Sequence, residues 1–392
     1  MGARAKPVVG IQPELLRWAR LSANMTAGEV ADKFKKHAEE IEGWERGEGG
    51  PSYAQLERLA YEIYKRPLAI FFLPTPPDEP KVRTEFRSLP DADLSALHRH
   101  TFLLIRKGYA FQASLDELYR GRNPTDRPLW REITLTTGQS ISAQAERARG
   151  LLGVSLNQVR AEPDDDSALK LWRRAIEAHG IFVFKDSFKQ QDISGFCLRH
   201  AEFPVILINN STTKTRQTFS LLHELAHLLF NRNGISRFDD AGIEELSPQD
   251  RTIEVFCNSI AAEILVPARD FAVAVRELNV DPRQASDEEF AILARRYHVS
   301  RSVILRRFLD QGRVTKAFYL EKDREWSNQR AAGGGGGDYY NTHGAYLSER
   351  FLRDVVASYS QRTITKSEAA EMIGVKPKNF STFQDLVLRG AA

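Results

Sequence analysis

The sequence of 392 residues contains only two cysteines, Cys197 and Cys257, and no long apolar run. Two cysteines cannot form a disulfide framework in a chain of this size, which indicates a reducing compartment. No stretch approaches the roughly 18 apolar residues that a membrane-spanning helix needs, so we expect no contact with a membrane. The first residues lead into no apolar segment, and we therefore expect no signal peptide. These absences together predict a cytoplasmic protein.

The sequence also lacks an excess of one charge sign. Its 55 Lys and Arg residues face 52 Asp and Glu residues, a formal net charge of +3. This balance permits contact with nucleic acid but does not favour it, because a basic surface is the usual electrostatic mark of such binding. Hydrophobic residues make up 42% of the chain, which is enough to bury real cores. The length predicts about two to four compact, globular units.

Apolar periodicity and linker composition divide the first part of the chain. Residues 1–76 contain four or five short helical segments, a pattern typical of a helix-turn-helix bundle. A proline-rich run over 74–80 cannot continue a helix and indicates a linker. Residues 77–162 are predicted to be this linker followed by a helical connecting region.

The remainder of the chain predicts a mixed core followed by helices. Residues 163–282 hold a helix, three strand-like runs (181–184, 193–198 and 205–208) and two further helices. Residues 283–330 have helix-turn-helix spacing, and 331–392 combine the flexible linker Gly333–Gly337 with a helical region. The predicted fold class is therefore α+β and mostly helical, with a small sheet in the central unit.

The motif with the clearest chemistry is His223-Glu224-Leu225-Ala226-His227, in the helix after the third strand. Side chains four residues apart share one helix face, so both imidazoles can bind one cation. Zinc with three protein ligands lowers the pKa of a bound water to about 7, and Glu224 is placed to take its proton. A chance match on a surface helix is the alternative. The apolar neighbours of the motif predict a buried helix, whose polar groups then need a ligand.

The third metal ligand has two candidates on the following helix, Glu254 and Glu263. Both glutamates flank the apolar stripe of this helix at equal angles, so periodicity does not choose between them. Glu254 lies in the first turn, where negative charge is favoured, which gives it a weak preference. The glutamate that does not bind metal is expected to be a solvated surface carboxylate.

Residues 219–230, which contain the motif, and Glu254–Pro267 with Asn258 resemble the ImmA/IrrE family of bacterial zinc metallopeptidases. The resemblance implies a zincin-like core in which His223, His227 and Glu254 hold Zn²⁺ and Glu224 is the general acid and base. Cys257 stands where the family has alanine. Known substrates of the family are helix-turn-helix repressor proteins, which are cut to release transcription.

The flanking regions extend the resemblance to long members of the family. Residues Trp44–Glu48, Pro51 and Leu56–Ala60 are similar to an XRE-type helix-turn-helix domain, and Phe86–Pro90 and the glycine linker recur in the long subgroup. Two main functional hypotheses follow. The first is an endopeptidase that cleaves a protein such as a transcriptional repressor. The second is an antitoxin and regulator that binds a PIN-like ribonuclease toxin, its zinc site structural or conditionally active. A harmful protease, itself the toxin, is a third.

The charge of the helical regions does not decide whether they bind nucleic acid or protein. Residues 1–75 hold 11 Lys and Arg against 10 Asp and Glu, and the expected recognition helix at 37–45 is rich in glutamate, which opposes phosphate contact. Contact with DNA and contact with protein are both retained, as is a homodimer, although no heptad seam establishes one. A basic cluster in residues 283–330 is either a nucleic-acid or acidic-partner surface or a solvated helix face; it comprises Arg295, Arg296, Arg301, Arg306 and Arg307.

The remaining reactive residue types carry no predicted site. Both cysteines are expected to be small buried hydrophobes. The other histidines lack ligand spacing and are expected to be surface or satisfied side chains. One of them, or a tyrosine such as Tyr339, is a candidate to stabilise an oxyanion, and nothing in the sequence selects which.

Overall fold

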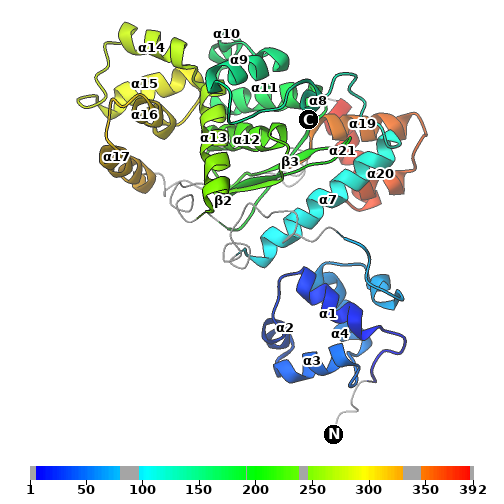
Figure 1. The fold of residues 1–392 in the computed structure, drawn as a ribbon. Coiled ribbons are helices and arrows are strands. Elements are labelled where there is room, and N and C mark those ends of the chain that lie inside the picture. The colour runs from blue at the N-terminus through cyan, green and yellow to red at the C-terminus, as the bar shows by residue number, and fades with distance from the viewer. Residues whose placement is uncertain (1–5, 80–96, 191, 238–245, 330–345, 389–392) are drawn as a thin grey trace. The chain divides into compact units, whose positions relative to one another are not determined.

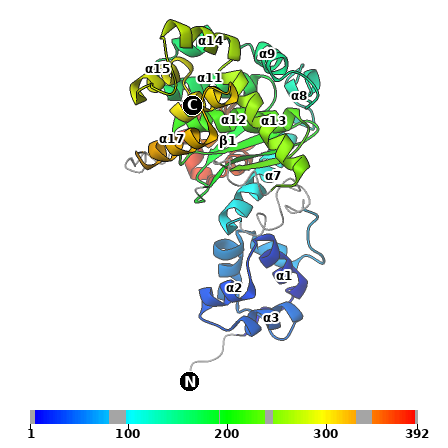
Figure 2. The ribbon, with the colours of Figure 1, turned by 60° about the vertical axis from the view of Figure 1, so that its left-hand side comes forward.

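The computed structural model describes residues 6–79, 97–190, 192–237, 246–329 and 346–388. The chain divides into two compact units, Met1–Lys107 and Gly108–Ala392. The fold class predicted from the sequence is confirmed, since helices dominate and the described residues contain one four-stranded sheet (Figures 1 and 2). The finer division at 76, 162, 282 and 330 stays a prediction. The linker Gly333–Gly337, Tyr339 and Phe86–Pro90 lie outside the described residues.

The first unit is a bundle of short helical segments around a small apolar core. Thr26 begins the second helix with a capping box, in which its side chain accepts a hydrogen bond from the backbone of Glu29. Gly47 ends the third helix in the left-handed conformation. Leu15, Val30 and Leu59 are among the buried core residues. The segments are α1 (Pro13–Ser22), α2 (Ala27–Phe34), α3 (Ala38–Arg46), α4 (Tyr53–Glu57), η1 (Arg58–Tyr64) and η2 (Leu68–Phe72).

The second unit is organised by a sheet with strand order β1-β3-β2-β4. Strand β1 (Phe182–Asp186) pairs parallel with β3 (Val205–Asn209), and β2 (Ile193–Leu198) pairs antiparallel with β3 and with β4 (Gly234–Arg237). The three predicted strands are present. The sequence did not predict β4, because four residues that begin with glycine give too short a pattern and depend on pairing with β2.

Helices cover both faces of this sheet (Figure 1). Val183 and Cys197 belong to a core that includes residues of α11 (Asp165–Ala178) and α12 (Lys214–Leu229). On the opposite face, Phe184 stacks on Phe111 of α7 (Arg99–Tyr119) with ring centroids 3.8 Å apart. Phe351 of α19 (Glu349–Ser360) contacts both rings. The sheet is therefore buried on two sides, which explains why its strands are nearly all apolar.

The remaining helices surround α12 and extend the helical part of the unit. Helix α13 (Pro248–Leu265) packs against both α12 and α9 (Ile141–Leu152). No helix among the described residues has the length and apolar character to cross a bilayer. The other segments are α8 (Leu129–Glu132), α10 (Leu156–Ala161), α14 (Ala268–Glu277), α15 (Asp287–Tyr297), α16 (Arg301–Asp310), α17 (Lys316–Gln329), α20 (Lys366–Met372), η4 (Pro377–Asn379) and α21 (Phe380–Leu388).

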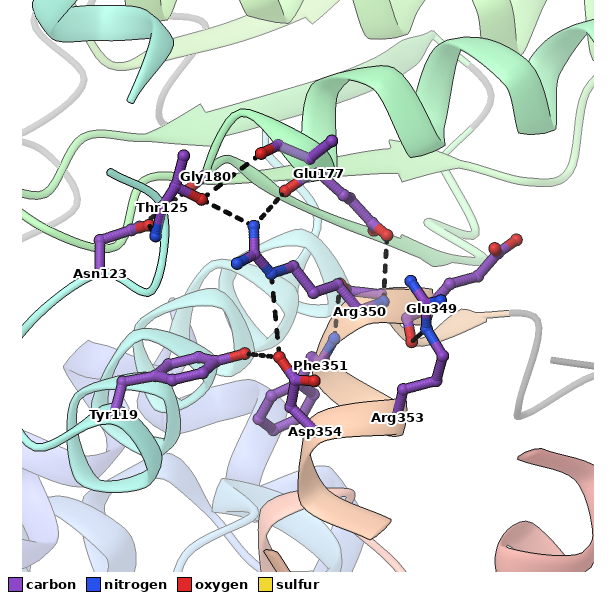
Figure 3. A network of polar contacts seen from close by, with 12 residues as sticks. Tyr119, Asn123, Thr125, Glu177, Gly180, Glu349, Arg350, Phe351, Arg353 and Asp354 are labelled. Carbon is purple, nitrogen blue, oxygen red and sulfur yellow. Dashed lines mark hydrogen bonds and ion pairs between the residues drawn. The ribbon is translucent and has the colours of Figure 1, made fainter. Parts of the chain in front are cut away.

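A polar network fastens α19 to the rest of the second unit (Figure 3). Arg350 donates hydrogen bonds to the Thr125 hydroxyl at 2.7 Å and to the backbone carbonyl of Glu177 at 2.8 Å. The hydroxyl of Tyr119 on α7 donates to Asp354. The predicted helical tail is thus built into the second unit.

Candidate metal centre

Helix α12 carries the His-Glu-Leu-Ala-His motif through the interior of the second unit. Thr213 begins the helix by accepting a hydrogen bond from the backbone of Arg216. The side chains of His223, Glu224 and His227 are enclosed, with relative exposures of 4%, 0% and 1%. The burial that the apolar neighbours predict is therefore confirmed, and these polar groups need partners.

Three side chains form a compact triangle of ligand atoms. The Nε2 atoms of His223 and His227 are 3.0 Å apart. Glu254 of α13 places one carboxylate oxygen 3.3 Å from His223 Nε2 and the other 3.2 Å from His227 Nε2. Ligands held about 2.0 Å from a tetrahedral zinc ion lie about 3.3 Å from one another. The triangle therefore has the size that such an ion requires, and it is the one candidate metal-binding group within the described residues.

The structure distinguishes the two glutamates that periodicity leaves equal. Glu254 faces the histidines, whereas Glu263 forms an ion pair with Arg307 of α16 and accepts hydrogen bonds from Ser142 Oγ at 3.0 Å and the backbone of Ala268 at 3.1 Å. The expectation that the second glutamate is a solvated surface carboxylate is wrong. Helix α9 packs on α13 here and contributes Ser142, and Arg307 reaches the carboxylate from α16, so Glu263 is buried and joins several helices.

Charges at the centre are strongly coupled. Burial on its own would raise the pKa of Glu254, but the two adjacent imidazoles outweigh this effect and lower its pKa below the usual range. Burial would lower the pKa of His227, yet Cys257 and Glu254 reverse the effect and raise it. The carboxylate is thus held ionised beside a histidine that readily takes a proton. A cation bound by the three groups would compete with that proton.

Glu224 is a buried carboxylate with no well-formed hydrogen bond on either oxygen, although the Ser236 hydroxyl and the Cys197 thiol lie close enough to interact with it. Burial raises its pKa, and the two histidines oppose this rise. A buried carboxylate in this state is costly unless a ligand or water supplies a donor. Its position next to the triangle is suitable for a general acid and base, which would exchange a proton with the attacking water.

Two glycines make room for these side chains, and the motif gave no signal for either. A Cβ atom at Gly234 of β4 would lie 2.8 Å from His227 Cγ and 3.3 Å from Glu224 Oε2. A Cβ atom at Gly195 of β2 would lie 2.9 Å from the Leu207 carbonyl oxygen and 3.5 Å from Glu224 Cγ. The close approach of α12 therefore requires glycine at Gly234, whereas at Gly195 the close approach of the Leu207 carbonyl of β3 requires it.

The other reactive residues lie as the sequence indicates. Both cysteines are buried, and burial raises the pKa of each thiol. His298 contacts Asp165 at 2.8 Å, and His179 Nδ1 lies 2.8 Å from the Ala175 carbonyl. His343 lies outside the described residues. None of the described histidines beyond the motif joins the triangle.

The arginines of α15 and α16 have carboxylate partners within the chain. Arg295 pairs with Glu288 at 2.6 Å, and the remaining four pair with acidic residues of α13, α14, α15 or α16. This cluster is therefore largely neutralised internally. The pairing weighs against a nucleic-acid surface. Four of the arginines are at least partly exposed, as a solvated helix face requires, whereas Arg307 is buried against Glu263 and does not belong to that face.

Comparison with known proteins shows that the metal centre lies in a stretch that matches a protein-family model. Residues 176–309 match the family model of the IrrE N-terminal-like domain, Peptidase_M78. No curated protein matches the chain. The matched stretch includes all four strands, the motif on α12 and Glu254 on α13. Residues 176–309 are thus similar to an IrrE N-terminal-like peptidase domain, which supports a function of the metallopeptidase type and agrees with the resemblance of these segments to the ImmA/IrrE family.

Proposed function

We propose that the protein is a zinc metallo-endopeptidase that acts in regulation by cutting a protein such as a transcriptional repressor. The observation that carries the proposal is the triangle of His223, His227 and Glu254, with ligand atoms 3.0 to 3.3 Å apart, beside the buried carboxylate of Glu224. The match of residues 176–309 to a peptidase family supports the same reaction class.

The donor set fits zinc, which prefers imidazole and carboxylate ligands and, in catalytic sites, three protein ligands with one open position. Bound there, Zn²⁺ would lower the pKa of a coordinated water to about 7 and polarise the peptide carbonyl. Glu224 then accepts the proton of the attacking water and delivers it to the leaving amine. Its enclosure strengthens these charge interactions by excluding bulk water.

The sheet offers a place for an extended substrate. Strand β4 lies at the end of the strand order and pairs on one side with β2. Gly234 of this strand is in contact range of the centre. A peptide that adds to the edge of β4 would present a backbone carbonyl to the ligands, which is the general way in which sheet edges recognise extended chains.

We further propose that the first unit recognises a protein partner. Glu39 and Glu42 of α3 are exposed, Glu42 with Arg46 at 3.9 Å, and Glu40 forms an ion pair with Lys36. Exposed carboxylates on this helix would repel phosphates, so they favour a protein surface over DNA. A band-shift titration of the full chain with operator-length duplexes at low salt tests this assignment. Tight binding that weakens steeply with added salt would contradict it.

The cleavage reaction is tested in cells that express the wild-type chain or Glu224→Gln. New protein N-termini, identified by labelling and mass spectrometry, are expected in the wild type and absent in the variant. Zinc content of both purified proteins is the control, because Glu224 is not a ligand. Equal sets of new N-termini would refute the peptidase. If Glu224→Gln still regulates as the wild type does, although it cleaves no protein, the antitoxin hypothesis would be favoured.

A further inference from the structure

Next to the metal centre lies the hydroxyl of Ser236, which has no role in the proposed cleavage reaction so far. Ser236 of β4 is buried, and its Oγ atom has no hydrogen-bond partner in the described chain. Both carboxylate oxygens of Glu224 are in the same state. A buried donor and a buried acceptor that are both unsatisfied, and close together, are an unusual and costly combination.

The strand geometry places this hydroxyl next to Glu224. Side chains two residues apart on a strand point to the same face. The Cβ direction at Gly234 leads to α12, with His227 Cγ at 2.8 Å and Glu224 Oε2 at 3.3 Å, so Ser236 points to the same face of the sheet. Across the ladder Ser236 pairs with Gly195, whose Cβ direction leads to Glu224 Cγ at 3.5 Å. Both neighbours of Ser236 therefore face this glutamate.

A local irregularity fixes the position of Ser236. The pairing of β2 with β4 shifts between Ile193 and Gly195, which leaves Ser194 as an extra residue. The hydroxyl of Ser194 donates to the Ser236 carbonyl at 3.0 Å. Bulges of this kind re-aim side chains next to active sites. The backbone of Ser236 is thus held from the neighbouring strand while its side chain is left to face Glu224.

The geometry points to Ser236 as a positioning residue that donates to one carboxylate oxygen of Glu224 and so holds the other oxygen in the orientation in which it would accept a proton. The inference rests on the proposed function, since it takes Glu224 as the general base. In this role the Ser236 hydroxyl acts on the reaction only through Glu224. A carboxylate held on one side exchanges protons in a fixed orientation, which is what general base catalysis requires.

The test uses acetohydroxamic acid, a small zinc chelator that passes a proton to a neighbouring carboxylate and needs no protein substrate. Its affinity for the zinc-loaded full chain is measured by calorimetry in the wild type, Glu224→Gln, Ser236→Ala and Ser236→Thr. We expect Ser236→Ala to bind about tenfold more weakly, the effect of one hydrogen bond to a charged group. Threonine keeps the hydroxyl and suits a strand, so Ser236→Thr is expected to restore most of the affinity.

Zinc affinity and a matched serine are the controls. Ser236→Ala is expected to bind zinc as the wild type does, because the ligand atoms are untouched. Ser348→Ala removes a fully buried hydroxyl, the N-cap of α19, and is expected to lower stability without changing hydroxamate affinity. Unchanged hydroxamate binding in Ser236→Ala, a parallel loss of zinc, or equal weakening in Ser348→Ala would each overturn the inference. Failure to find a cleaved protein would refute the proposed function alone, because this assay involves no cleavage.

Discussion

Gly234 provides a direct way to disturb the metal centre without touching a ligand. In Gly234→Ala the new Cβ atom would lie 2.8 Å from His227 Cγ and 2.9 Å from Cδ2. Reaching ordinary contact at 3.4 Å requires a movement of about 0.6 Å, about three times the tolerance of roughly 0.2 Å for a metal-ligand distance. His227 is 1% exposed, so its ring has little space into which it can move.

The expected result is a zinc affinity lowered about 10- to 100-fold, the range seen when the support of a ligating histidine is lost. Competition with a chromogenic chelator measures this affinity. Gly150→Ala is the matched control, because Gly150 lies in α9 with no atom within 4 Å of the added Cβ. That variant is expected to bind zinc normally and to gain about 0.5 to 1 kcal/mol in helix stability. Wild-type zinc affinity in Gly234→Ala would refute the packing argument.

Three further predictions follow from the same contacts. Because the pKa of His227 is raised, protons compete with zinc for its imidazole. Zinc affinity measured by chelator competition should therefore rise between pH 6 and pH 8, and an affinity that does not change with pH would contradict this coupling. Arg307→Ala leaves the Glu263 charge buried without its ion-pair partner, so chemical denaturation should show a loss of about 3 to 5 kcal/mol; adding Glu263→Met should recover only part of it, because Ser142 and Ala268 then lose their acceptor. Arg350→Ala should lower stability by about 1 to 3 kcal/mol through the bonds to Thr125 and Glu177, and unchanged unfolding would disprove the role of the network in Figure 3.

Much of the second unit follows from local sequence patterns. The three predicted strands are apolar runs bounded by turn residues, and α12 and α13 follow from their caps and apolar stripes. Spacing on one helix also brings His223 and His227 together, since their separation of four residues is a property of the helix itself. These features depend on short-range geometry.

The parts that were not predicted depend on contacts between distant segments. Helical periodicity leaves Glu254 and Glu263 equal, and only their tertiary partners separate them: the histidines of α12 for Glu254, and Ser142 of α9 with Arg307 of α16 for Glu263. Strand β4 is too short for a pattern, yet it supplies Gly234 and Ser236 to the centre. Tertiary pairing, which a single sequence does not encode locally, determines these positions.

Metal analysis of the purified full chain tests the central claim most directly. The account predicts one zinc ion per chain in the wild type, loss of zinc in Glu254→Gln and retention in Glu263→Gln, a change of the same chemical kind on the same helix. A wild-type chain that binds no zinc after reconstitution, or a Glu254→Gln variant that retains one ion with wild-type affinity, would contradict the assignment of the centre.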